Sequence, residues 1–164
     1  MIFAQESPTS SKPSSSHVST EQEASPLGHA KISPDINSFL QSLESAWNAH
    51  NSNSLASLWT SNGDLITPWG RWIVGSLQIE KHFDKQKTGP LGKGKVELSL
   101  DSMRYLTAQL AVLDVTIKLS NILDPQGELP PNLLQHAVFI LTKENDLWKI
   151  VSLRVYQFQP QQIE

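Results

Sequence analysis

The last two β-type runs of the sequence each hold one side chain that could carry out chemistry. His136 lies in the penultimate run, and Arg154 lies in the last run, six residues after Trp148. An imidazole titrates near neutral pH, so His136 could act as a general acid or base, while Arg154 could donate charge-assisted hydrogen bonds to an anionic ligand. The alternatives are a strand histidine bonded to a neighbour, and an arginine in an ion pair at a sheet edge or a dimer interface.

A second group of candidate residues lies between residues 62 and 75. Trp69 lies in a Pro-Trp-Gly turn, and Trp72 follows shortly after it. Turns are usually exposed and an exposed indole needs a reason, so these tryptophans could line the mouth of a pocket for a small apolar or aromatic molecule. Asp64 follows an Asn-Gly pair and is most simply a turn or helix-cap residue; the alternative is a further contact in the ligand site.

Composition excludes several other classes of function. The chain has 164 residues and a formal net charge of -3, with its lysines and arginines scattered, so no basic face for nucleic acid is expected. It has no cysteine, and its five histidines are dispersed, which gives no spacing for a metal site and suggests no cofactor. No apolar run approaches the roughly 18 residues that a membrane span needs, so no membrane contact is expected.

The chain divides into a tail and one domain. Residues 1–32 are rich in Ser, Thr, Pro, Glu and Gln, which predicts a disordered tail, and residues 33–160 form a single predicted domain. A short apolar run that ends at Ala4 resembles the end of an export signal. If the true start lies upstream, the protein is expected to be periplasmic or secreted; otherwise it is expected to be cytoplasmic.

The first half of the domain is predicted to be mainly helical. Ser33 is a good N-cap and Pro34 a good first residue for a helix whose apolar residues follow at spacings of three and four up to Trp47. Polar residues 48–53 should end it and cap a second helix, which an Asn-Gly turn at 62–63 closes. The apolar residues of this second helix are Leu55, Leu58 and Trp59.

Short strands at residues 65–67 and 71–74 then form a hairpin, and Ser76 can cap a third helix that ends near residue 87. From residue 95 onward the apolar period switches to two. Two long antiparallel strands precede a loop at residues 121–132, and a hairpin of residues 133–142 and 147–158 closes the domain. These last strands are apolar on both faces, so the sheet should be covered by helices on one side and by a second subunit on the other.

This α+β order resembles the cone-shaped nuclear-transport-factor-2-like (cystatin-like) fold, in which three helices pack on a strongly curved antiparallel sheet. The resemblance is greatest to small SnoaL-like and ketosteroid-isomerase-like bacterial domains, and it covers residues 34–158. The residues that carry it are Ala46-Trp47-Asn48-Ala49-His50-Asn51, Leu55, Leu58-Trp59, Gly63-Asp64-Leu65-Ile66-Thr67-Pro68, Gly75 and Leu147-Trp148-Lys149-Ile150-Val151-Ser152. These motifs specify the fold well and the activity poorly.

The resemblance implies a pocket inside the cone, with Thr67 on its wall. In the isomerase branch a carboxylate base stands where this chain has Thr67, and a tyrosine stands where it has Leu43, so isomerase chemistry of the usual form is disfavoured. Two hypotheses follow. The protein binds a small apolar or aromatic molecule in the cone, as a lyase, isomerase or cyclase if His136 is suitably placed, or it is a non-catalytic homodimeric module whose cone is filled by its own side chains.

Overall fold

The computed structural model describes residues 33–124, 126–127 and 132–157. The predicted tail, and the end of the last predicted strand beyond residue 157, lie outside these residues. The described residues form three helices and one six-stranded sheet. The helices are α1 (Pro34–Asn48), α2 (Ser52–Ala56) and α3 (Ser76–Gln86), and the strands are β1 (Trp59–Ile66), β2 (Trp72–Val74), β3 (Lys95–Thr107), β4 (Leu110–Ser120), β5 (Leu133–Glu144) and β6 (Leu147–Tyr156).

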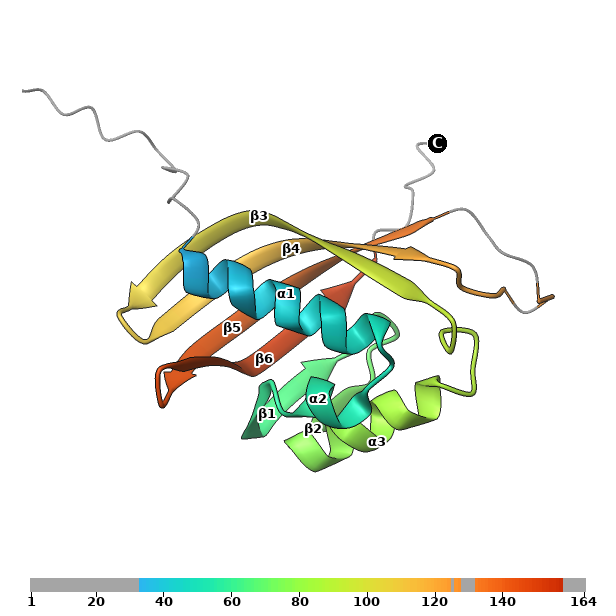
Figure 1. The fold of residues 1–164 in the computed structure, drawn as a ribbon, viewed down its shortest axis with the longest axis horizontal. Helices are drawn as coiled ribbons and strands as arrows, with labels where there is room; N and C mark the ends of the chain where they lie inside the picture. Colours follow the sequence, from blue (N-terminus) through green and yellow to red (C-terminus); the bar gives the residue numbers. More distant parts are fainter. Residues whose placement is uncertain (1–32, 125, 128–131, 158–164) are drawn as a thin grey trace, which may run out of the picture.

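The sheet is curved and open, with strand order β2-β1-β6-β5-β4-β3. All neighbouring strands are antiparallel except β1 and β6, which run parallel. Helix α1 lies across the concave side of the sheet, and α2 and α3 lie beside β1 and β2 (Figure 1). The predicted α+β architecture is therefore confirmed, with one parallel pair in a sheet that was expected to be wholly antiparallel.

Helix α1 begins where the capping residues predict, and its first turn is bonded to the hairpin of β5 and β6. Its apolar stripe is buried, and its first-turn carboxylate, Asp35, accepts a hydrogen bond from Trp148 Nε1 at 3.1 Å. Lys143 Nζ forms an ion pair with the same carboxylate at 3.0 Å and lies over the Trp148 ring. One acidic residue thus satisfies the helix dipole and joins α1 to the β5–β6 hairpin. The buried stripe consists of Ile36, Phe39, Leu40 and Leu43.

The segment after α1 differs from the predicted helical hairpin. Asn51 caps α2 as expected, accepting a hydrogen bond from the Ser54 backbone at 3.0 Å, but α2 ends at Ala56. Trp59 is not helical; it begins β1 and pairs with Ile150 of β6. Gly63 lies inside β1 and not in a turn. The backbone pairing with β6 outweighs the local helical spacing of the apolar residues.

Helix α3 also begins differently from the prediction. Its N-cap is Gly75, at φ 87°, and not Ser76, and no side chain caps this end. A positive φ suits glycine, which lets the chain turn sharply from β2 into the helix. Ile79 and Phe83 are the buried residues of α3, and Phe83 packs edge-on against Trp47 of α1. This contact joins α3 to α1, and both helices contribute to the wall of the pocket described below.

Candidate ligand pocket

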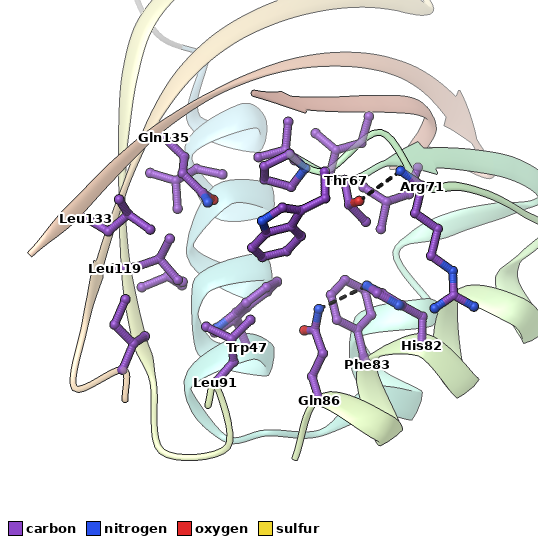
Figure 2. Close-up of a pocket in the computed structure, with 18 of the residues that line it drawn as sticks. Trp47, Thr67, Arg71, His82, Phe83, Gln86, Leu91, Leu119, Leu133 and Gln135 are labelled. Atoms are coloured by element: carbon purple, nitrogen blue, oxygen red, sulfur yellow. Dashed lines mark hydrogen bonds between the residues drawn. The ribbon is translucent and has the colours of Figure 1, made fainter. Parts of the chain in front are cut away.

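The concave face of the sheet and helices α1 and α3 enclose an open cavity of about 690 Å³. A volume in this range suits a small organic ligand. Its wall is mainly aliphatic and aromatic, and Trp47, Phe83, Leu119 and Leu133 lie around it in Figure 2. This open volume disagrees with a cone filled by its own side chains, which the sequence had left as an alternative.

Gln135 of β5 is the most enclosed amide in the wall. It is only 6% exposed, and its side chain points into the cavity across from Arg71 and His82 (Figure 2). Its cross-strand partner on β4 is Ile117, which also lines the cavity. Within the described ranges the Gln135 side-chain amide makes no hydrogen bond, and its polar atoms remain accessible from the cavity. It can therefore both donate to and accept from a bound molecule.

His82 brings a titratable group into the wall from α3. Burial lowers its pKa below the usual value, and the charges of Arg71 and Lys85 lower it further. Gln86 Nε2 lies 2.9 Å from His82 Nε2. This contact joins the two side chains, and the lowered pKa favours the neutral imidazole. The neighbouring Lys81, Lys85 and Lys87 are a pattern typical of a solvated helix face, which in sequence hides the position of His82.

Thr67 lines the cavity, as the resemblance implied. It is buried, and its hydroxyl oxygen accepts a hydrogen bond from the Arg71 backbone at 3.2 Å across the turn that follows β1. The hydroxyl proton remains available to a ligand. Trp69, in the same turn, also lines the cavity and is 74% exposed, which places it at the mouth. Both residues line the cavity, and their roles in ligand binding stay predictions.

The other candidate residues lie on the outer face of the sheet. Arg154 donates to both carboxylate oxygens of Asp64, at 2.9 and 2.8 Å, and Trp72 Nε1 donates to Asp64 at 2.7 Å. None of the three lines the cavity, because side chains alternate along a strand and Leu153 and Val155 of β6 face inward. Arg154 is thus in the ion pair that was its alternative reading, and Asp64 is a strand residue and not a turn residue.

His136 also faces outward, since its neighbours Gln135 and Ala137 belong to the alternating buried residues of β5. Its ring stacks on that of Tyr156 with 6.0 Å between ring centroids, and its Nδ1 lies 3.5 Å from the Thr116 hydroxyl. This matches the reading of a strand histidine bonded to its neighbours. Neither His136 nor Arg154 lines the pocket, so the expectation that they face it is wrong. Acid or base catalysis by His136 stays a prediction, and its side chain does not reach a ligand in this cavity.

No protein-family model and no curated protein matches the sequence. Solved structures do match its shape. A cystatin-like domain of unknown function from Nostoc punctiforme is 23% identical, with a TM-score of 0.65 over 76% of this chain and 75% of that one. A ketosteroid isomerase-like protein from Erwinia carotovora is 14% identical, with a TM-score of 0.64 over 77% and 95%. An NTF-2 like protein of unknown function from Shewanella oneidensis is 17% identical, with a TM-score of 0.63 over 75% and 97%. This chain has the nuclear-transport-factor-2-like fold.

Within this nuclear-transport-factor-2-like cone, the described wall offers no carboxylate. Thr67 and Leu43, the two positions that the resemblance compares with the isomerase base and tyrosine, are both buried and both line the cavity. No group of three or more His, Asp or Glu side chains in the described ranges could hold a metal ion. None of the described helices combines the length and apolar character that a membrane crossing requires.

The Asp64–Arg154 pair yields a prediction about stability and pH. The Arg154 guanidinium is the main cause that lowers the pKa of Asp64 to about 2. A depressed carboxyl pKa stabilises the fold above the unfolded value near 4, and that stabilisation is lost as the pH falls towards 2. Because Arg154 is partly exposed, we expect Asp64→Asn to lower the unfolding free energy at pH 7 by only about 1 to 2 kcal/mol.

Urea unfolding followed by tryptophan fluorescence at pH 7, 4 and 2.5 measures this difference. The gap between wild type and Asp64→Asn should shrink as the pH falls below 4. Asp146→Asn, in the exposed β5–β6 turn, removes a carboxylate that lies outside this cluster and should have little effect at any of these pH values. A gap that stays constant down to pH 2.5 would show that the ionised Asp64 is not the source of the stabilisation.

Proposed function

We propose that this protein binds one small, mainly apolar molecule inside the cone, with a polar atom of that molecule hydrogen-bonded to Gln135. The observation that carries the proposal is an open apolar cavity whose wall holds a buried amide without a partner among the described residues. The polar atoms of this amide are accessible from the cavity, so they can bond to a molecule that occupies it. A carbonyl or hydroxyl group on a ligand would complete its bonding.

The proposal is one of binding, and catalysis is a separate step. Proton abstraction by a wall carboxylate has no support among the described residues, because the wall has none. His82 is the titratable imidazole of the described wall, and it could accept a proton from a substrate only if its contact with Gln86 were released. The alternative of a filled, non-catalytic association module is disfavoured by the open volume.

We also propose that a second copy of the chain covers the outer face of the sheet. Helix α1 lies across the concave side and α2 and α3 lie beside β1 and β2, so none of the described helices covers the outer face (Figure 1). It presents large apolar side chains to solvent, which is typical of interaction surfaces. We refer to this set as the outer-face patch, and it consists of Trp72, Val74, Leu134 and Tyr156.

Gln135→Leu tests the binding proposal. Prodan, a neutral naphthyl ketone whose emission responds to its surroundings, is a suitable probe because it is apolar and carries one carbonyl group. We expect wild-type protein to bind prodan with a blue shift, and Gln135→Leu to weaken that binding roughly three- to tenfold through the lost hydrogen bond. The variant should be at least as stable as wild type, because no hydrogen bond within the described protein is lost.

Gln41→Leu is the matched control, since Gln41 is exposed on α1 and outside the cavity wall. Fluorescence titration gives the affinities, and urea unfolding gives the stabilities. If wild-type protein leaves prodan emission unchanged, the cavity does not serve as a pocket for such molecules. If Gln135→Leu binds as wild type does, the amide is not the ligand's anchor.

A further inference from the structure

We infer that the pocket selects an amphipathic anion, with its apolar body in the cone and a carboxylate at the mouth between Arg71 and Lys85. This inference rests on the proposed function and adds the chemical class of the ligand. It reassigns the charge-assisted contact that the sequence had suggested for Arg154. The guanidinium of Arg154 is already bonded to both oxygens of Asp64 on the outer face, so it has no such contact to give inside the cone.

Two cations contribute to the cavity wall from different elements. Arg71 comes from the turn between β1 and β2, and Lys85 from the last turn of α3, and both contribute to the cavity wall. His82 lies close enough to both for their charges to act on its imidazole. Figure 2 shows the Arg71 side chain extending beside His82. The mouth therefore carries two positive charges next to an apolar interior.

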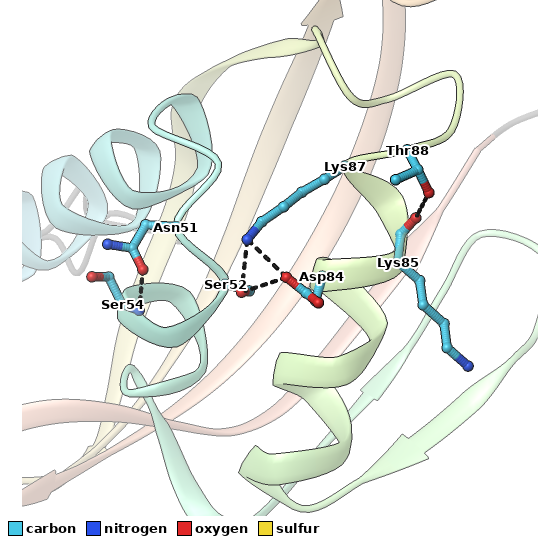
Figure 3. A network of polar contacts seen from close by, with 7 residues as sticks. All are labelled: Asn51, Ser52, Ser54, Asp84, Lys85, Lys87 and Thr88. Atoms are coloured by element: carbon cyan, nitrogen blue, oxygen red, sulfur yellow. Dashed lines mark hydrogen bonds and ion pairs between the residues drawn. The ribbon is translucent and has the colours of Figure 1, made fainter.

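These charges have no counter-ion among the described residues. Neither Arg71 nor Lys85 forms an ion pair there, and the described wall contains no Asp or Glu. Asp84 lies on the same helix as Lys85, but it is occupied on the other side by Lys87 at 2.8 Å and by Ser52 at 3.4 Å. Figure 3 shows Lys85 pointing away from that network.

This local excess of positive charge is opposite in sign to the whole molecule, whose formal net charge is -3. General attraction of anions to the protein is therefore not expected, and selection must come from the mouth itself. A carboxylate there would accept charge-assisted hydrogen bonds from a guanidinium and an ammonium group, while its apolar body occupied the cavity. Gln135, on the opposite wall, would then contact a carbonyl or hydroxyl group along that body.

Dodecanoate and its neutral methyl ester form a matched ligand pair, because they share an apolar chain and differ in charge. Displacement of prodan reports the affinity of each. We expect wild-type protein to prefer dodecanoate, and Arg71→Gln/Lys85→Gln to bind dodecanoate at least tenfold more weakly while its affinity for the ester is unchanged. Raising the salt concentration should weaken dodecanoate binding to wild type more than ester binding.

Lys81→Gln/Lys93→Gln is the control, since it removes two exposed positive charges that lie outside the cavity wall. It should bind both ligands as wild type does, and circular dichroism confirms that both double variants are folded. Equal loss of acid and ester affinity in Arg71→Gln/Lys85→Gln, or no loss of either, would overturn the carboxylate inference while leaving the pocket intact. Absence of prodan, acid and ester binding to wild type would instead overturn the proposed function.

Discussion

Gly63→Ala is expected to lower the free energy of unfolding by about 3 kcal/mol, although it adds a single methyl group. A Cβ atom at residue 63 would lie 2.7 Å from the carbonyl oxygen of Ile150 and 2.9 Å from the hydroxyl oxygen of Thr60. It would also lie 3.0 Å from Cδ1 of Trp59. Two of these atoms belong to the backbone of a central strand or to a buried indole, so neither can move aside cheaply.

The clash occurs where β1 and β6 pair irregularly. Their register shifts between Trp59 and Asp64, and Gly63 allows the two backbones to approach closely there. Glycine within a strand commonly marks such an approach. The parallel β1–β6 pair connects β2 and β1 to the rest of the sheet, so a change at this position should affect global stability and not only a local turn.

Thermal and urea unfolding measure this effect, and a loss of about 3 kcal/mol corresponds to a fall in melting temperature of roughly 6 to 12 °C for a domain of this size. Gly89→Ala is the matched control. A Cβ at Gly89 would meet only the Gln86 carbonyl oxygen, at an ordinary 3.7 Å, so its stability should stay near that of wild type. If Gly63→Ala were as stable as the wild type, β1 and β6 would have to move apart at this point at little cost.

Local sequence patterns were sufficient for most of the fold. The proline and apolar stripe at the start of α1, and the two-residue period of β3 to β6, depend only on neighbouring residues, and the structure confirms both. Trp59 and Gly63 were assigned wrongly because their conformation depends on β6, almost 90 residues later in the chain. A pairing that distant leaves no local signal, whereas the Asn-Gly pair suggested a turn.

The site was harder to predict because neighbouring residues of a strand point to opposite faces, so an error of one position reverses the face. His136 attracted attention for its chemistry, but Gln135 is the residue that reaches the cavity. A usable signal did exist, since Gln135 falls in the same alternating series as Ala137 and Phe139. The same holds for His82, which follows Ile79 at helical spacing and so belongs to the buried side of α3.

The second large effect is expected for substitutions on the outer face of the sheet. We expect Leu134→Glu/Val74→Glu to weaken the proposed homodimer about 100-fold, because two-fold symmetry would place four new carboxylates in a surface that association removes from water. Leu134 is 55% exposed and Val74 is 49% exposed. Neither side chain is buried in a single chain, so the fold of each subunit should tolerate the change.

Sedimentation over a range of protein concentrations measures the dimer dissociation constant. Gln41→Glu/Ser45→Glu adds the same charge to exposed positions on α1, which lies across the concave side of the sheet, and should leave the dimer unchanged. A wild-type protein that stays monomeric at tens of micromolar would contradict the proposal, as would a Leu134→Glu/Val74→Glu variant that dimerises normally. Because the cavity opens on the concave side, prodan binding should survive in the monomeric variant, which separates the ligand proposal from the dimer proposal.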